Sequence, residues 1–179
     1  MQKDEARIMP NARLMQKRGY RGAALALFMA LLPQAAPAEE KKTIFAVANF
    51  TYSDTSGEAV DQTKAHAERL HRFMAALDAD LEKAGTFQVK VLSCPSVPCA
   101  DTPASGAALL ADAQKAGAAR LLVGSIQRVS TLITYLKVDV FDVAANKPVF
   151  THLYTFRADT EEAWSKAEEI LAEQLKTLN

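Results

Sequence analysis

The sequence lacks the short motifs that identify several common enzyme classes. None of its serines stands in a Gly-x-Ser-x-Gly turn, and the segments SGAALL and GAARLLVGS lack the glycines of a phosphate-binding loop. Asp139 and Asp142 fall on opposite faces of an expected strand, so they do not form a carboxylate pair for acid–base chemistry. We therefore predict no catalytic residues, and a hydrolase or an oxidoreductase is the least favoured function.

The apolar segment near the N-terminus is short. Residues 22–32 are uncharged and mostly apolar, but eleven residues are too few to cross the roughly 30 Å hydrocarbon core of a bilayer as a helix. Three basic residues between positions 17 and 21 precede the segment, and Ala36 and Ala38 follow it with the small side chains that signal peptidase recognises. The pattern predicts a secretory signal peptide cleaved between Ala38 and Glu39, and no stable membrane anchor.

Cleavage at this position would leave a single domain. Residues 1–38 are then an N-terminal extension with the signal peptide, whose start codon could be Met1, Met9 or Met15, and residues 39–179 are one α/β domain. The domain has 15 basic and 19 acidic residues, a formal charge of −4, and no basic cluster, so we expect no binding to nucleic acid. No cysteine near the cleavage site could carry a lipid, and we expect a periplasmic protein.

Cysteine is scarce, because the chain has only Cys94 and Cys99, in the segment SCPSVPC. In the oxidising periplasm we expect a disulfide between them. The ring has six residues and contains two prolines, so the gain should be smaller than the about 2 kcal/mol of the chain-entropy model. Two alternatives are a redox pair, which typically has the spacing Cys-x-x-Cys, and a metal clip that would need His66 or His152 as a further ligand.

The apolar periodicity in the first part of the domain predicts alternating strands and helices. Residues 43–52, TIFAVANFTY, are apolar on both faces near their start, which is typical of a central strand buried on both sides. Residues 70–84 have apolar side chains at helical spacing, and a strand over residues 87–92 follows. Thr102 is the expected N-cap of a second helix, which Gly117 ends.

The second part predicts an antiparallel meander and a closing helix. Residues 119–131 and 132–143 are β-rich neighbours, with Leu132 expected on the buried face, and residues 149–157 add a third strand. Asp159 is expected to start the last helix with a capping box. The order β-α-β-α-β-β-β-α describes a single-domain α/β sandwich, with a mixed five-stranded sheet and three helices. The expected apolar side of the last helix contains Trp164, Ala167, Ile170, Leu171, Leu175 and Leu178.

The polar loop after the first strand is the first candidate for a binding surface. It contains four side chains with oxygen atoms that a calcium ion could use: Asp54, Ser56, Glu58 and Asp61. The spacing does not match an EF-hand loop, because the sixth position is not glycine and the twelfth is not glutamate. A solvated loop that leads into a helix is the alternative interpretation.

The histidines do not form a recognisable metal site. His66 and His71 are five residues apart, so on a helix they point about 140° away from each other, and we expect both at the surface. His152 lies between Phe150 and Tyr154 on one face of an expected strand. These three residues form either an aromatic strip for a partner or ligand, or part of the core beneath a helix, and we favour the core.

Three segments carry a resemblance to a known family. FAVANFTYSDTSGE, LLVGSIQRVSTLITYLKVDVFDV and FRADTEEAWSKAEEIL resemble secreted proteobacterial proteins of a family of unknown function, over residues 43–178. The order of strands is also similar to the N-terminal domain of TolB, and to related domains of curli-secretion and penicillin-binding-protein-activating lipoproteins. Those domains are binding and assembly modules, so the resemblance implies this fold and a binding function. It implies no catalytic residue.

We therefore predict a non-enzymatic periplasmic accessory protein that docks onto another periplasmic or envelope protein. The alternative is a carrier of a small molecule or a metal ion, which would use the loop 54–61 or the aromatic strip. No cofactor and no metal ligand set are predicted. The expected functional surface contains Asp54, Ser56, Glu58 and Asp61, and then Arg157 and Asp159.

Overall fold

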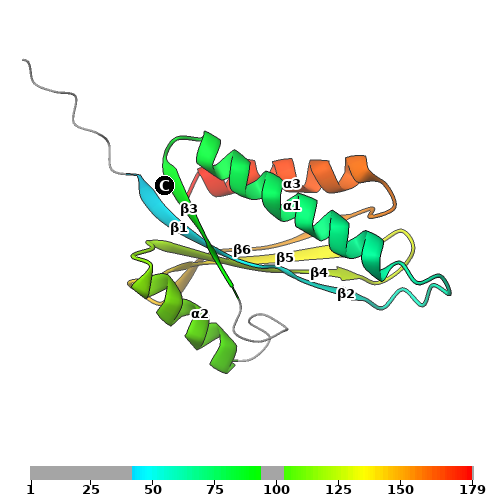
Figure 1. The fold of residues 1–179 in the computed structure, drawn as a ribbon, viewed down its shortest axis with the longest axis horizontal. Helices are drawn as coiled ribbons and strands as arrows, with labels where there is room; N and C mark the ends of the chain where they lie inside the picture. The colour runs from blue at the N-terminus through cyan, green and yellow to red at the C-terminus, as the bar shows by residue number, and fades with distance from the viewer. Residues whose placement is uncertain (1–41, 94–102, 179) are drawn as a thin grey trace, which may run out of the picture. The chain divides into compact units, whose positions relative to one another are not determined.

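The computed structural model describes residues 42–93 and 103–178 (Figure 1). The signal peptide with its cleavage between Ala38 and Glu39, the N-cap Thr102, and the disulfide between Cys94 and Cys99 lie outside the described residues, and all three stay predictions. The elements are β1 (Thr43–Ala48), β2 (Thr51–Asp54), α1 (Thr63–Lys83), β3 (Phe87–Leu92), α2 (Pro103–Lys115), β4 (Arg120–Arg128), β5 (Thr134–Asp142), β6 (Lys147–Phe156) and α3 (Glu161–Lys176).

The strands form one mixed sheet in the order β3-β1-β4-β5-β6, and β2 also pairs with β4. The pairs that involve β1 or β2 are parallel, whereas β4, β5 and β6 form an antiparallel meander. The predicted α/β class, with three helices and a mixed sheet, is confirmed. The sheet has six strands instead of five among the described residues, because the strand expected over residues 43–52 is divided into β1 and β2.

The division between β1 and β2 inserts one extra residue opposite β4. Val47 pairs with Leu122, but Thr51 pairs with Ser125, so four steps on the first strand match three steps on the second. An extra residue reverses which face each later side chain occupies. As a result, Tyr52 lies on the same face as Val47, where the larger core is, and the remaining side chains of β2 follow this new alternation.

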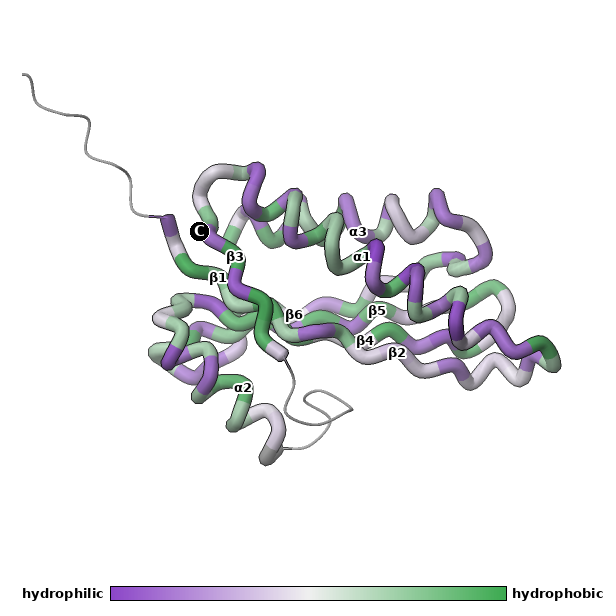
Figure 2. The backbone as a smooth tube through the Cα atoms, in the orientation of Figure 1, coloured by the Kyte–Doolittle hydropathy of each residue, from purple (hydrophilic) through white to green (hydrophobic). Residues whose placement is uncertain are grey.

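Helices cover both faces of the sheet. In Figure 1, α1 and α3 lie side by side over one face, and α2 lies over the other. As predicted, β1 is buried on both sides, since Phe45 and Val47 belong to the core under α1 and α3, while Ala46 and Ala48 belong to the smaller core under α2. Figure 2 shows the matching pattern, with hydrophobic stretches in β1 and alternating hydrophilic and hydrophobic turns along the helices.

Both expected glycine helix ends are present. The helix α1 ends at Lys83 and is followed by Gly85 with φ +80°, while α2 ends at Lys115 and is followed by Gly117 with φ +70°. These left-handed conformations favour glycine and turn the chain away from the helix. Among the described residues, no helix is both long and apolar enough to span a bilayer.

Four details of the sequence-based prediction are wrong. Leu132 is 49% exposed, because the chain enters β5 only at Thr134. Ile170 is 41% exposed at the edge of the apolar side of α3. The N-cap of α3 is Thr160, not Asp159, since the backbone N–H of Ala163 donates to the hydroxyl of Thr160. His66, expected at the surface, is 2% exposed.

Candidate functional site

Arg128 is the centre of a cluster of charged side chains at one end of the sheet. It is the last residue of β4 and only 4% exposed. Its Nη1 donates to Oε2 of Glu58 at 2.7 Å, to Oδ2 of Asp54 at 3.1 Å and to the hydroxyl oxygen of Ser56 at 3.2 Å. The structure thus brings three of the four predicted loop residues together around a single buried cation.

The end of β2 and the following loop place these acceptors. Asp54 is opposite Arg128 in the parallel pairing of β2 and β4. Its Oδ1 accepts the backbone N–H of Ser56 at 2.8 Å, which is the local turn that short acidic side chains favour. The backbone N–H of Thr55 donates to the carbonyl of Arg128 at 2.8 Å and continues the pairing by one residue.

The fourth predicted residue, Asp61, has a different part in the loop. Its Oδ1 accepts the backbone N–H of Thr63 at 2.9 Å and the Thr63 hydroxyl at 2.6 Å, at the start of α1. The neighbouring Gln62 donates its amide to Glu58. Asp61 therefore fixes the entry into the helix, and it does not contact Arg128.

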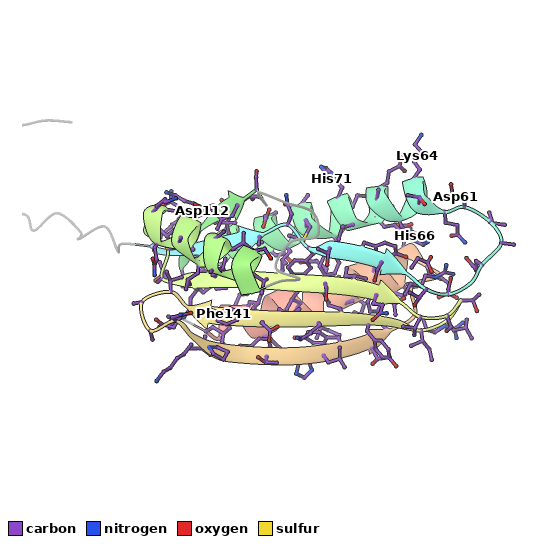
Figure 3. All side chains as sticks on the ribbon, turned by 90° about the horizontal axis from the view of Figure 1, so that it is seen from below. Asp61, Lys64, His66, His71, Asp112 and Phe141 are labelled. Carbon is purple, nitrogen blue, oxygen red and sulfur yellow. The ribbon has the colours of Figure 1, made fainter. Side chains whose placement is uncertain are left out.

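His66 and Tyr52 form a stacked pair above this cluster. Their ring centroids are 4.9 Å apart with an interplanar angle of 23°. Nε2 of His66 lies 3.5 Å from Oδ2 of Asp54. The two ring nitrogens of His66 and the hydroxyl of Tyr52 make no hydrogen bond within the described part of the chain. Figure 3 shows His66 turned from α1 toward the sheet, with His71 pointing away from it.

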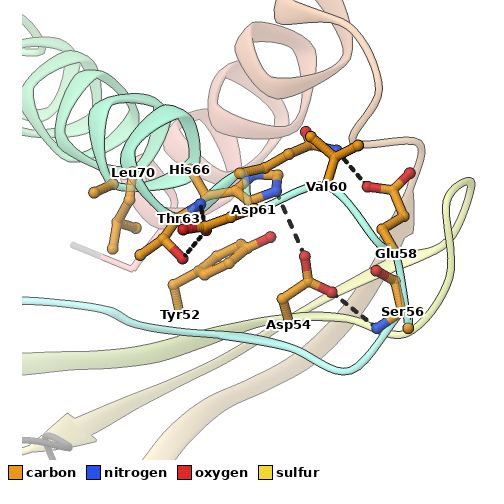
Figure 4. A pocket seen from close by; sticks show the side chains of 12 residues that line it. Tyr52, Asp54, Ser56, Glu58, Val60, Asp61, Thr63, His66 and Leu70 are labelled. Carbon is orange, nitrogen blue, oxygen red and sulfur yellow. Dashed lines mark hydrogen bonds and ion pairs between the residues drawn. The ribbon is translucent and has the colours of Figure 1, made fainter.

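A cavity of about 580 Å³ opens between the loop and the first turns of α1 (Figure 4). Its polar lining includes all four predicted loop residues, together with Tyr52 and His66. Apolar side chains line it as well, namely Val60, Ala67 and Leu70. The volume falls in the range of about 300–1,000 Å³ that is typical of ligand sites.

The charges of the cluster hold its members in defined protonation states. Burial alone would raise the pKa of Asp54, but hydrogen bonds from Ser56 and Arg128 outweigh it and lower the pKa to about 2. The hydrogen bond from Arg128 lowers the pKa of Glu58. Burial, followed by the nearby Arg128 charge, lowers the pKa of His66, so its imidazole is neutral at pH 7. Burial raises the pKa of Tyr52 to about 12.

This arrangement does not join a nucleophile to a base. The hydroxyl of Ser56 faces Arg128 and not the imidazole of His66. Asp54 and Glu58 each direct one carboxylate oxygen to the guanidinium, so a metal ion that took these two oxygens as ligands would compete with Arg128. Within the described residues, no three histidine, aspartate or glutamate side chains converge as a metal site would require.

The second predicted pair lies apart from the cavity. Arg157 and Asp159 contact each other at 3.2 Å between β6 and α3, and neither lines the cavity. Ala158 between them is buried, and its carbonyl accepts the indole N–H of Trp164 at 3.2 Å. The pair is a surface feature beside the core.

Arg128, His66 and Tyr52 are members of the site that the sequence did not predict. Arg128 lies two and six residues after the core residues Ile126 and Leu122, so strand alternation alone points its side chain inward. A buried arginine requires acidic partners. His66 lies seven residues before Phe73 on α1, a spacing that also indicates the buried side.

The strand β6 forms the outer edge of the sheet. It is ten residues long and pairs only with β5 among the described residues. Phe150, Tyr154 and Phe156 pack partly against the core, which agrees with the favoured interpretation of the aromatic strip, although His152 between them is exposed. Leu153, on the opposite face, is 58% exposed, and Val149, which has no partner in the register with β5, is 45% exposed.

Residues 43–175 match the family DUF3280, whose description is "Protein of unknown function (DUF2380)". This agrees with the resemblance to a family of unknown function that the sequence carries. No curated protein matches the chain.

The solved structures to which this chain is similar share little sequence with it. TolB from Acinetobacter baumannii is 14% identical with a TM-score of 0.48, and the match covers 75% of this chain and 27% of TolB, so the chain spans about a quarter of that protein. A PelC dodecamer from Paraburkholderia phytofirmans is 15% identical with a TM-score of 0.46, covering 75% and 86%. The LpoB C-terminal domain from Escherichia coli is 14% identical with a TM-score of 0.39, covering 68% and 87%.

Proposed function

We propose that this chain, which belongs to the DUF3280 family of proteins of unknown function, is an accessory domain of the bacterial cell envelope that binds another envelope protein. The predicted signal peptide supports the location. The cluster around Arg128 supports a non-enzymatic role, because its hydrogen bonds hold a loop in place and do not activate a nucleophile.

The observation that carries the binding function is the free edge of β6. We define the β6 edge surface as residues 149–156, which are strand residues without a partner strand on their outer side among the described residues. Natural proteins usually protect long edges with charges, prolines or bulges. Here Lys147, Pro148 and the irregularity opposite Val140 and Phe141 protect only the beginning of the strand.

The exposed side chains on this strand suit an extended partner. Val149 and Leu153 are exposed apolar residues four positions apart, and Val149 is the residue without a partner at the register irregularity between β5 and β6. Thr151 between them donates its hydroxyl to Asp139 of β5 at 2.7 Å, which holds this side of the strand in place. We infer that the partner adds an extended segment to β6, with backbone hydrogen bonds for affinity and apolar side chains that contact Val149 and Leu153.

The test compares three forms of the mature protein as baits in a detergent-solubilised envelope extract of the host. They are the wild type, the double variant Val149→Lys and Leu153→Lys, and the control Ile170→Lys. Ile170 is a similarly exposed apolar residue, but it lies on α3. We expect the wild type and the control to retain the same envelope protein in similar amounts. The double variant should retain at least ten-fold less of it.

Two results would contradict the proposal. One is equal retention by all three forms, which would place the contact elsewhere. The other is retention of only a second copy of this chain. The unfolding midpoints of the variants should stay within a few degrees of the wild type, because the substituted side chains are exposed.

A further inference from the structure

The cavity between the loop 54–61 and α1 contains buried polar groups without a hydrogen bond among the described residues, although Nε2 of His66 lies 3.5 Å from Oδ2 of Asp54. The His66 side chain is 2% exposed, lines the cavity, and makes no hydrogen bond through either nitrogen. The Tyr52 hydroxyl is also buried without a hydrogen bond. Burying a polar group without a hydrogen bond is unfavourable, so native proteins rarely keep two such groups side by side without a partner.

The charges of the lining indicate the sign of that partner. Three carboxylates line the cavity, from Asp54, Glu58 and Asp61, and the lining contains no lysine or arginine. Arg128 lies beneath the first two and compensates one negative charge. Carboxylate oxygens accept more than one hydrogen bond, so Asp54 and Glu58 keep capacity for a further donor. The cavity therefore favours a ligand with positive charge.

The remaining walls indicate an organic ligand. Leu70 and Ala67 form an apolar side, and the Tyr52 ring, which is stacked on His66, adds an aromatic wall. Val60 is 72% exposed and lines the cavity, so a ligand with an apolar body would contact it there. A hydrated inorganic ion would leave these apolar contacts unused.

We propose that this cavity binds a small organic amine in its ammonium form, with a short apolar body. The ammonium group donates to Asp54 and Glu58, and a ring nitrogen of His66 accepts a further hydrogen bond from it. The apolar body lies along Leu70 and beneath Val60. The site is separate from the β6 edge surface, since no residue of β6 lines it, so the two proposals can fail independently.

The experiment is calorimetric titration of the full mature chain at pH 7 with three probes of the same shape and different charge. They are 2-phenylethylammonium, the neutral 2-phenylethanol and the anion 3-phenylpropanoate. We expect the cation to bind at least ten-fold more tightly than the alcohol, and the anion to give no measurable heat. Equal affinities for the three probes, tighter binding of the anion, or no heat from the cation at millimolar concentration would overturn the proposal.

Variants at the exposed Val60 keep the test independent of folding. Val60→Lys should weaken the cation at least five-fold, whereas Val60→Glu should strengthen it, because the substituted charge lies at the mouth of the cavity. Tyr52→Phe, which removes only the unsatisfied hydroxyl, should weaken binding three- to ten-fold. His71→Gln, on the outer side of α1, should leave the affinity unchanged. The same affinity for both Val60 variants would contradict an electrostatic site.

Discussion

Arg128 and Asp54 are opposite each other at the ends of two parallel strands, and Nη1 of Arg128 lies 3.1 Å from Oδ2 of Asp54. The same guanidinium also contacts Glu58, four residues further along the loop. One buried cation thus holds both the end of β2 and the loop that leads into α1. This contact connects the sheet to the helix that covers it.

Replacement of Arg128 should therefore destabilise the domain strongly. Arg128→Met leaves Asp54 and Glu58 without their cation, and we expect the free energy of unfolding to fall by about 2–4 kcal/mol. The matched control is Arg157→Met, which removes an exposed pair with Asp159 and should cost less than about 1 kcal/mol. Urea unfolding followed by circular dichroism measures both values. Similar losses for the two variants would refute the structural role of Arg128.

Glu168 on α3 should make the domain less stable as the pH rises through the range from about 4.5 to 7. It is 4% exposed, and burial, reinforced by the nearby Asp80 and Glu169 charges, raises its pKa from 4.5 to about 7. Between these values the folded state holds a proton that the unfolded state has released, so folding weakens with increasing pH.

The variant Glu168→Gln removes this titration. We expect it to be more stable than the wild type at pH 8 by about 1–3 kcal/mol, and to differ little at pH 4.5. Glu68→Gln, an exposed position on α1, is the control and should show no such pH-dependent difference. Unfolding midpoints in urea across this pH range give the comparison. A difference between Glu168→Gln and wild type that does not change with pH would contradict it.

Gly124 on β4 leaves space for the buried ring of Phe50. A Cβ atom at position 124 would lie 2.5 Å from the ring of Phe50. We expect Gly124→Ala to destabilise the domain by about 1–3 kcal/mol, because the ring is 4% exposed and has little room to move. In a Phe50→Leu background the same substitution should cost at least about 1 kcal/mol less. A double-mutant cycle measures this coupling, and additive effects would contradict the contact.

The start of α3 gives a prediction that separates two neighbouring residues. Thr160→Ala removes the acceptor for the Ala163 N–H and should cost about 1 kcal/mol. Asp159→Ala removes only an exposed contact with Arg157 and should cost less than about 0.5 kcal/mol. Thermal unfolding compares the two, and a larger loss for Asp159→Ala would favour the capping box expected from the sequence.

The sequence predicted the helices and strands well, because the spacing of apolar residues within each element is typical of its type. The helices and the meander follow local patterns, and the buried strand β1 is a run of apolar residues. The extra residue between β1 and β2 was missed, because a strand that is apolar on both faces hides its alternation. The change of alternation is nevertheless visible in the sequence. Phe45 and Val47 have odd residue numbers, whereas Phe50 and Tyr52, which contribute to the same core, have even ones.

The candidate site was only partly predictable for a similar reason. The loop residues Asp54, Ser56 and Glu58 are visible as a polar segment, but their contact with Arg128 depends on the register of β2 against β4. That register is a property of the folded sheet and joins residues more than seventy positions apart. Burial of His66 depends on how α1 is rotated over the sheet, which the local sequence around the histidine does not determine.

The central claim is that another envelope protein adds a strand to β6, and photocrosslinking in living cells tests it most directly. A photoreactive amino acid is placed at position 153 on the β6 edge surface, or at position 170 on α3 as the control. We expect position 153 to give one crosslinked envelope protein, absent at position 170 and lost when Val149→Lys is added. A crosslink only between copies of this chain, or the same product from both positions, would contradict the account.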